Sequence, residues 1–138
     1  MGPNEKKLRE IYQLYESGDL ETVISMLADD VVMRSFGAPN RLDHCGEWHG
    51  HDGARAFIRA LAENWTFARI QLLEMFHEDD RRFVVRTAVT GVHHRSGARV
   101  SVERVDLVTM KDGKCVSYLE VYDTAPLERA SRRAPRGQ

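Results

Sequence analysis

The sequence predicts an α+β domain in which helices pack on one face of a curved antiparallel sheet. Two patterns indicate this class: apolar residues recur at helical spacing up to about residue 65, and long strand-like stretches separated by turn signals follow. The length of 138 residues suits one domain, because such a chain buries roughly 68% of its unfolded surface without disulfides or metals. We therefore expect a single domain over residues 1–125.

Three helices are predicted in the first half of the chain. Apolar residues at helical spacing indicate a first helix over 5–17, and Gly18 follows where a helix would end in a left-handed residue. Asp19 can cap a short second helix that ends near Ala28. The clearest helix is predicted over 53–65, since Asp52 is a good N-cap and one apolar face continues for three turns.

The remaining elements are predicted strands. Residues 31–33 are short and β-branched, which favours a strand, whereas 37–50 are rich in Gly, Pro, Asn and Asp and favour a loop. Antiparallel strands are predicted over 68–77, 82–94, 99–110 and 115–123, with turns at 79–80, 96–97 and 112–113. The composition after Pro126 predicts a disordered basic tail over 126–138.

The composition is that of a soluble globular protein. Apolar residues make up 42% and charged residues 30%, and no apolar run approaches the ~18 residues of a membrane helix. Residues 1–7 lack the apolar segment of a signal peptide, so we expect a cytoplasmic protein with no membrane partner. Cys45 and Cys115 form no CxxC motif, which suits free thiols in a reducing compartment.

Charge is unevenly distributed along the chain. Residues 127–138 hold four arginines against one glutamate, whereas residues 1–126 hold 16 basic and 20 acidic residues. Because nucleic-acid-binding domains usually carry a basic excess, nucleic acid is not an expected partner.

The last predicted hairpin places charged side chains on one face. A three-residue turn at 111–113 sets Asp106 opposite Tyr118 and Arg104 opposite Glu120, so both acids share a face. The other face is more apolar and carries Val105, Leu107, Leu119 and Val121.

Two interpretations of this hairpin are open. In the first, which the pattern alone favours, the apolar face covers the core and Arg104, Asp106 and Glu120 form a solvated cluster. In the second, Asp106 and Glu120 point into a pocket, where burial raises the pKa of one carboxyl and lets the pair donate and accept protons.

Three stretches resemble a known superfamily. They run from Gly18 through Val32, from Trp48 into the predicted helix at 53–65, and from Val105 through Lys114. They resemble the nuclear transport factor 2-like superfamily, which also contains ketosteroid isomerase and the SnoaL-like polyketide cyclases. The resemblance implies a cone-shaped fold, in which the sheet wraps around three N-terminal helices, with a cavity inside and a homodimer formed through the convex sheet face.

The resemblance also implies catalytic roles. Asp106 matches the strand aspartic acid that ketosteroid isomerases keep protonated to stabilise an oxyanion, whereas their base falls near Ser35 and their tyrosine near Ile11. SnoaL-like cyclases pair an acid with a histidine on a neighbouring strand. His93 would take this role if 96–97 is a two-residue turn, and His94 would take it if the turn has three residues.

Glu120 resembles the last acid of the Asp-Arg-Asp set of limonene epoxide hydrolases, but we expect no Arg-x-Asp where the first two members belong on the preceding strand, and this activity is not expected. A zinc site is a further possibility by residue type, but its candidate ligands lie in a predicted loop without a reliable carboxylate, and no metal is expected. Those candidates are His44, Cys45, His49 and His51.

The expected function is acid/base catalysis without a cofactor: an isomerase, cyclase or dehydratase acting on a mid-sized apolar carbonyl compound. Asp106, Glu120 and His93 are the predicted catalytic residues. The predicted substrate-binding residues are Tyr12, Tyr15, Met33, Ser35, Trp48, Phe57, Tyr118 and Tyr122. The alternative is a non-catalytic module of the same fold that binds a small ligand or a protein.

Overall fold

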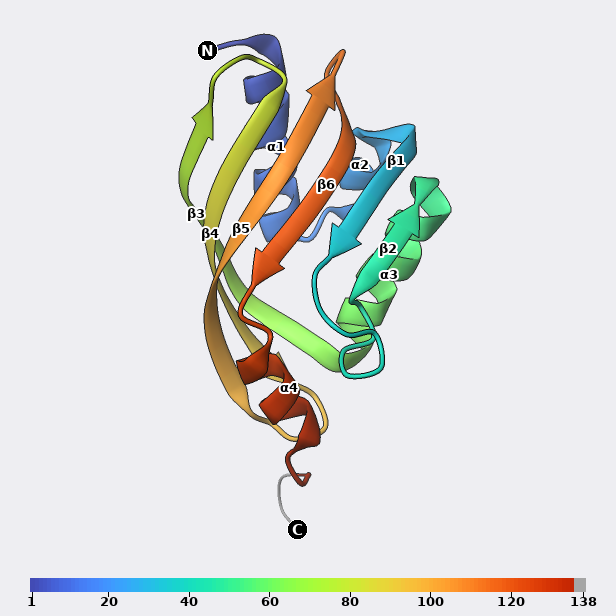
Figure 1. The fold of residues 1–138 in the computed structure, drawn as a ribbon, viewed down its shortest axis with the longest axis vertical. Helices are drawn as coiled ribbons and strands as arrows, with labels where there is room; N and C mark the ends of the chain where they lie inside the picture. The colour runs from blue at the N-terminus through green and yellow to red at the C-terminus, as the bar shows by residue number, and fades with distance from the viewer. Residues whose placement is uncertain (136–138) are drawn as a thin grey trace.

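The computed structural model describes residues 1–135 as a curved six-stranded sheet, with three helices on one face and a fourth at one end (Figure 1). The helices are α1 (Pro3–Ser17), α2 (Leu20–Ser25), α3 (Gly50–Asn64) and α4 (Ala125–Arg132). The strands are β1 (Leu27–Ser35), β2 (Gly46–His49), β3 (Trp65–His77), β4 (Arg82–His93), β5 (Arg99–Lys111) and β6 (Lys114–Tyr122). The predicted α+β class and cone-shaped architecture are confirmed.

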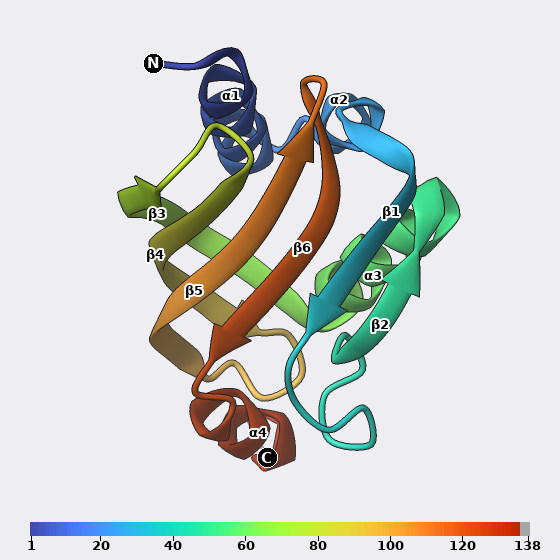
Figure 2. The ribbon, with the colours of Figure 1, turned by 45° about the horizontal axis from the view of Figure 1, so that its top comes forward.

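The sheet is mixed rather than purely antiparallel. Its strand order is β2-β1-β6-β5-β4-β3, and every neighbouring pair is antiparallel except β1 and β6. Parallel neighbours need a long connection, and here the chain passes through β2, α3 and the β3–β5 meander before β6 returns beside β1. Figure 2 shows α1, α2 and α3 behind the strands, where they close the inner side of the sheet.

Two elements near β1 differ from the prediction. β1 begins at Leu27, which lies within the predicted second helix and before the predicted strand at 31–33. Its exposed Asp29 and Asp30 are poor strand formers, so the sequence pattern does not indicate the first half of this strand. β2 occupies part of the predicted 37–50 loop. It is a short strand paired only with β1, so its four residues carry too little pattern to be recognised.

The predicted disordered tail is wrong over residues 126–132, which belong to α4. Leu127 and Ala130 are buried on this helix and join a core cluster with Trp65. Arg95 donates hydrogen bonds to the backbone carbonyls of Ser131 and Arg133, which ties the helix end to the β4–β5 turn. Residues 136–138 of the predicted tail lie outside the described residues.

The β5–β6 hairpin differs from the predicted register by two residues. Its turn has two central residues, Asp112 (φ 51°) and Gly113 (φ 79°), and the register shifts once after Thr109. Asp106 consequently lies opposite Glu120. A displacement of two residues preserves which side chains share a face, because successive strand residues alternate.

Burial decides between the two interpretations of this hairpin. Asp106 is 0% and Glu120 3% exposed, whereas Leu107 on the opposite face is 43% exposed. The charged face therefore points inward, toward the helices, and the more apolar face points outward. No helix among residues 1–135 is both long enough and apolar enough to cross a membrane.

Candidate functional site

A buried arginine bridges two carboxylates at the centre of the inner face. Arg104 and Asp106 are alternate residues of β5, and Glu120 lies opposite Asp106 on β6. Arg104 Nε and Nη2 lie 2.8 Å and 3.0 Å from the two oxygens of Asp106, and Nη1 lies 3.4 Å from Glu120 Oε2. The side chain of Arg104 is only 11% exposed, so these contacts operate with little solvent screening.

Asp106 holds Arg104 rather than facing the cavity. Its Oδ2 also accepts a 2.6 Å hydrogen bond from Tyr12 Oη, and Asp106 is not among the described residues that line either lobe of the cavity described below. A carboxylate that accepts from a guanidinium and a phenol has no hydrogen to donate to an oxyanion. The implied role of Asp106 as a protonated donor therefore does not fit this geometry.

Glu120 has one engaged and one free oxygen. Oε2 contacts Arg104 and accepts a 3.4 Å hydrogen bond from Tyr118 Oη, whereas the buried Oε1 has no hydrogen-bond partner among residues 1–135. Burial raises the pKa of this carboxyl, Arg104 lowers it and Asp106 raises it, and the result is a pKa of about 7. Both protonation states are therefore populated near neutral pH.

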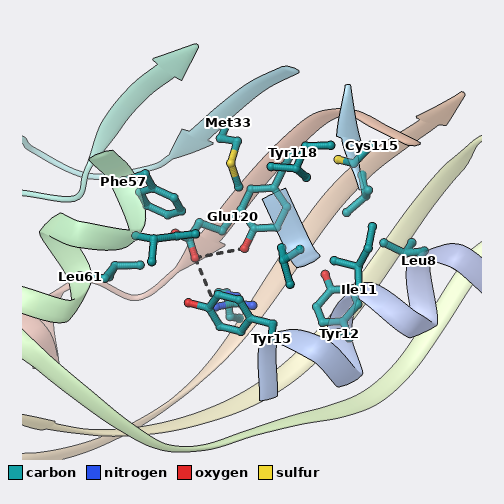
Figure 3. A pocket seen from close by; sticks show the side chains of 15 residues that line it. Leu8, Ile11, Tyr12, Tyr15, Met33, Phe57, Leu61, Cys115, Tyr118 and Glu120 are labelled. Atoms are coloured by element: carbon teal, nitrogen blue, oxygen red, sulfur yellow. Dashed lines mark hydrogen bonds and ion pairs between the residues drawn. The ribbon is translucent and has the colours of Figure 1, made fainter. Parts of the chain in front are cut away.

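A two-lobed cavity surrounds Glu120. The larger lobe is about 70 Å³ and lies between α1, α2, α3 and the sheet, and the smaller lobe is about 30 Å³ and extends toward α4. Tyr15, Leu61, Arg104 and Glu120 line both. Figure 3 shows the larger lobe, with Glu120 and Tyr118 pointing toward each other between the α3 side chains and those of α1. A benzene ring occupies a cavity of ~150 Å³ elsewhere, so a ring-sized ligand requires side chains here to move.

Tyr15 offers a free donor to this cavity. Its hydroxyl makes no hydrogen bond with another residue among 1–135, and burial raises its pKa to about 12. The phenol therefore stays protonated at neutral pH. Tyr12, by contrast, is committed to Asp106.

The structure brings together most of the predicted substrate-binding residues. Tyr12, Tyr15, Met33, Phe57 and Tyr118 line the larger lobe, and Tyr122 lines the smaller one.

Ser35 and Trp48, which are also predicted to bind substrate, line neither lobe. Ser35 is buried opposite Glu120 on the neighbouring strand, and its Oγ has no hydrogen-bond partner among residues 1–135. Trp48 donates its indole hydrogen to the backbone oxygen of His44 and packs its ring 6.0 Å from that of Phe57.

His93 lies on the predicted face but at the wrong end of the sheet. The connection between β4 and β5 spans 94–98. The imidazole of His93 contacts Ser96 Oγ at 3.0 Å, and its ring centroid lies 4.9 Å from that of Trp65. Asp106 pairs with Val85, eight residues away along β4, or about 26 Å at ~3.3 Å per residue. The predicted catalytic partnership of His93 with Asp106 is therefore wrong.

Sequence reasoning missed His44 as a cavity residue. His44 is 2% exposed, its Nε2 lies 2.6 Å from Tyr122 Oη, and it lines the smaller lobe. Burial lowers its pKa to about 4, so the imidazole is neutral near pH 7. The only signal was its place in the histidine-rich loop, which suggested metal binding.

The four candidate metal ligands do not converge. His49 is exposed beside Glu47, His51 contacts the backbone oxygen of Leu27, and Cys45 donates to the backbone oxygen of Phe36. No three His, Cys, Asp or Glu side chains in the described part of the chain are placed to hold a metal ion.

Arg104 and Asp106 form an Arg-x-Asp pair on the strand that precedes Glu120. The expectation that the preceding strand lacks such a pair is wrong, because Arg104 and Asp106 lie on that strand, directly against Glu120. The acid–arginine–acid arrangement is thus present, with Arg104 between the two carboxylates.

Comparisons with known proteins agree with this architecture. An NTF2-like protein of unknown function from Burkholderia pseudomallei is 26% identical, with a TM-score of 0.84 over 96% of this chain and 99% of that one. A second, from Burkholderia xenovorans, is 20% identical (TM-score 0.81; 94% and 96% covered). TerC, co-crystallised with polyporic acid, is 21% identical (TM-score 0.80; 94% and 98% covered). No curated protein sequence matches significantly. Residues 8–118 match the model of the SnoaL-like domain. The chain belongs to the SnoaL-like domain family.

Proposed function

We propose that this protein is an acid/base enzyme, working without a cofactor, that moves a proton on an apolar carbonyl compound. The observation that carries the proposal is Glu120: a buried carboxyl with a pKa of about 7 and one free oxygen beside the cavity. A general base is most effective when its pKa lies near the operating pH, since it must both take up and release the proton.

The proposed reaction begins with Glu120 Oε1 taking a proton from the carbon next to the carbonyl. The electrons of the broken C–H bond form a C=C bond, and the carbonyl π electrons move to oxygen. The resulting enolate oxygen accepts a hydrogen bond from Tyr15 Oη and lies near the positive charge of Arg104. Where a C=C bond adjoins the deprotonated carbon, the enolate extends over it as a dienolate. Glu120 then returns its proton to the far carbon of that bond, so that the carbonyl re-forms, the double bond moves into conjugation with it and the carboxylate is regenerated.

Asp106 and Tyr12 support this step from behind. Asp106 accepts two hydrogen bonds from the Arg104 guanidinium and one from Tyr12, which holds the guanidinium at the cavity wall, so its charge needs no reorganisation when the enolate forms. The resemblance to TerC, a protein of the same fold that was co-crystallised with polyporic acid, supports a small organic molecule as ligand.

Carbon-bound proton exchange tests the proposal. The probe is 2-tetralone, an apolar ketone with acidic hydrogens beside its carbonyl, incubated in D₂O and followed by proton NMR. We expect catalysed exchange whose rate rises with pH through about 7, because the base must be ionised. Glu120→Gln should lower the rate at least ~100-fold. The matched control Glu103→Gln, an exposed residue of β5, should leave it unchanged.

Exchange that equals the buffer rate, or that survives Glu120→Gln, would contradict the proposal. If the ketone binds without exchange, the chain is a binding module of the same fold.

The position of Arg104 between two acids favours a second candidate, hydrolysis of an epoxide. Glu120 would remove a proton from water as the water oxygen attacks an epoxide carbon, and the C–O bond of the epoxide would break to give an alkoxide. A second water would protonate the alkoxide and take the proton that Glu120 holds, which completes the diol and regenerates the carboxylate. Formation of the diol from styrene oxide, measured by chromatography, tests this candidate. Wild-type protein that forms no diol above the buffer rate contradicts it.

We also propose that a second copy of the chain covers the outer face of the sheet. Phe76, Val84 and Leu107 are 56%, 37% and 43% exposed and lie side by side across β3, β4 and β5. An exposed apolar row of this kind is typical of an interaction surface. The superfamily resemblance implies a homodimer through the same face.

A further inference from the structure

The smaller lobe ends in a buried pair of polar side chains. His44 Nε2 and Tyr122 Oη lie 2.6 Å apart, and their rings are nearly parallel, with centroids 6.4 Å apart and 14° between planes. Trp48 fixes the loop that carries His44, because its indole donates to the His44 backbone oxygen. The other walls specific to this lobe are apolar: Phe67, Ile70, Val89, Gly91, Val100, Val102 and Leu127.

We propose that Tyr122, paired with His44, binds a second oxygen of the substrate, a hydroxyl or carbonyl remote from the carbon that Glu120 deprotonates. The identity of that carbon rests on the proposed function, whereas the binding of the second oxygen does not. The substrate class is thereby narrowed to apolar carbonyl compounds with a distal oxygen.

The spacing of β6 supports this placement. Tyr118, Glu120 and Tyr122 are alternate residues of the strand and all line the cavity. Alternate strand residues are about 7 Å apart. A ligand whose reacting carbon lies at Glu120 therefore reaches Tyr122 with its far end.

The pair can serve either kind of oxygen. When the His44 Nε2 accepts the Tyr122 hydrogen, the phenol oxygen is left to accept from a ligand hydroxyl. When Nε2 carries the hydrogen and donates it to the phenol oxygen, Tyr122 can donate its own hydrogen to a ligand carbonyl. The first arrangement needs a neutral imidazole, and burial keeps the pKa of His44 at about 4, so the ring can take either role near pH 7.

Glu120 supplies an independent indication of a polar ligand at this junction. It lines both lobes, is 3% exposed, and has an oxygen with no partner among the described residues. Buried polar atoms are nearly always hydrogen-bonded in folded proteins, so this oxygen is available to a ligand. Tyr15 and Leu61 also line both lobes, so a ligand that occupies both would contact these side chains.

Two matched aromatic probes test the inference. 2-Naphthol resembles the enol of 2-tetralone, and 2,6-dihydroxynaphthalene adds a hydroxyl at the opposite end of the same two rings. We expect the diol to bind wild-type protein about tenfold more tightly in fluorescence titrations, the effect of about one hydrogen bond. Tyr122→Phe should reduce this ratio to about one, and His44→Phe provides a second variant with the same expected loss.

His49→Phe is the matched control. It makes the same exchange as His44→Phe at an exposed histidine that lines neither lobe, and the tenfold ratio should survive it. A ratio of one in wild type, a ratio that survives both Tyr122→Phe and His44→Phe, or failure of both probes to bind overturns the inference.

The outcomes also separate this inference from the proposed function. Glu120-dependent exchange of 2-tetralone combined with a ratio of one overturns the second-oxygen site alone. A tenfold ratio that depends on Tyr122, without any exchange, supports the site and contradicts the acid/base enzyme.

Discussion

Replacing Glu120 by glutamine should stabilise the fold, and the gain should grow with pH. The glutamine is close in shape to the protonated carboxyl and keeps an oxygen for Arg104, but it cannot become a buried anion. Burial raises the pKa of Glu120 to about 7, from an ordinary value of 4.5. A carboxyl whose pKa is raised by folding costs stability wherever the unfolded chain has already released its proton.

The magnitude follows from the two pKa values. Below pH 4.5 the carboxyl is protonated in both states and costs nothing, and between 4.5 and 7 the cost grows with each pH step. Each tenfold change in proton affinity is worth about 1.4 kcal/mol. The cost therefore reaches about 1 kcal/mol at pH 5 and about 3 kcal/mol at pH 8.5. Glu120→Gln should recover these amounts.

Urea denaturation of both proteins at pH 5 and pH 8.5 measures the difference in unfolding free energy. Other titrating groups are common to both proteins, so they cancel in this difference. Glu103→Gln, on the exposed face of β5, is the control, and its difference in unfolding free energy from wild type should not increase with pH. A difference between wild type and Glu120→Gln that is independent of pH would refute the reasoning, because it would show that Glu120 does not titrate between these values.

Two further changes test the rest of the site and the outer face. Asp106→Asn removes the bidentate carboxylate partner of the buried Arg104. We expect the unfolding free energy, measured by urea denaturation, to fall by about 3–5 kcal/mol. An unchanged value would mean that Asp106 does not hold Arg104. Leu107→Lys places a charge in the exposed apolar row and should convert a dimer to a monomer in sedimentation equilibrium. A wild-type protein that is already monomeric at micromolar concentration would contradict the proposed dimer.

Much of the fold is predictable because it depends on local patterns. Helical spacing in 5–17 and 53–65 locates α1 and α3 to within a few residues. The faces of β5 and β6 are also predictable, even though the register is displaced by two residues, because strand alternation depends only on whether the displacement is even. The two-residue turn at Asp112 and Gly113 displaces the register by one residue, and the shift after Thr109 adds the second residue, which restores the parity.

The burial of the charged face is not predictable from strand pattern. A face that carries Arg104, Asp106 and Glu120 resembles a solvated one until the helices that cover it are known, and those helices precede it by about 40 residues or more in the chain. The superfamily resemblance supplied what the local pattern lacked.

Long-range packing explains the other failures. His93 lies on the predicted face of β4, but its distance from Asp106 depends on the register between β4 and β5, which places Val85 rather than His93 opposite Asp106. His44 reaches Tyr122 only because an irregular loop folds against the end of β6. α4 forms because Leu127 and Ala130 are covered by residues from three other segments, which no property of the tail itself reveals.

Two features of the β5–β6 hairpin lower the stability of the fold, and they have different causes. A charged triad is buried on its inner face, where Glu120 alone costs about 3 kcal/mol above neutral pH. Leu107 and Val105 are exposed on its outer face, where they lose the stabilisation of burial. Exchanging the two faces would relieve both, so the arrangement is better explained by function than by folding. If the buried charges serve catalysis, Glu120→Gln should stabilise the chain without changing its oligomeric state. If the exposed apolar residues serve self-association, Leu107→Lys should dissociate the dimer without changing the pH at which the exchange rate of 2-tetralone rises.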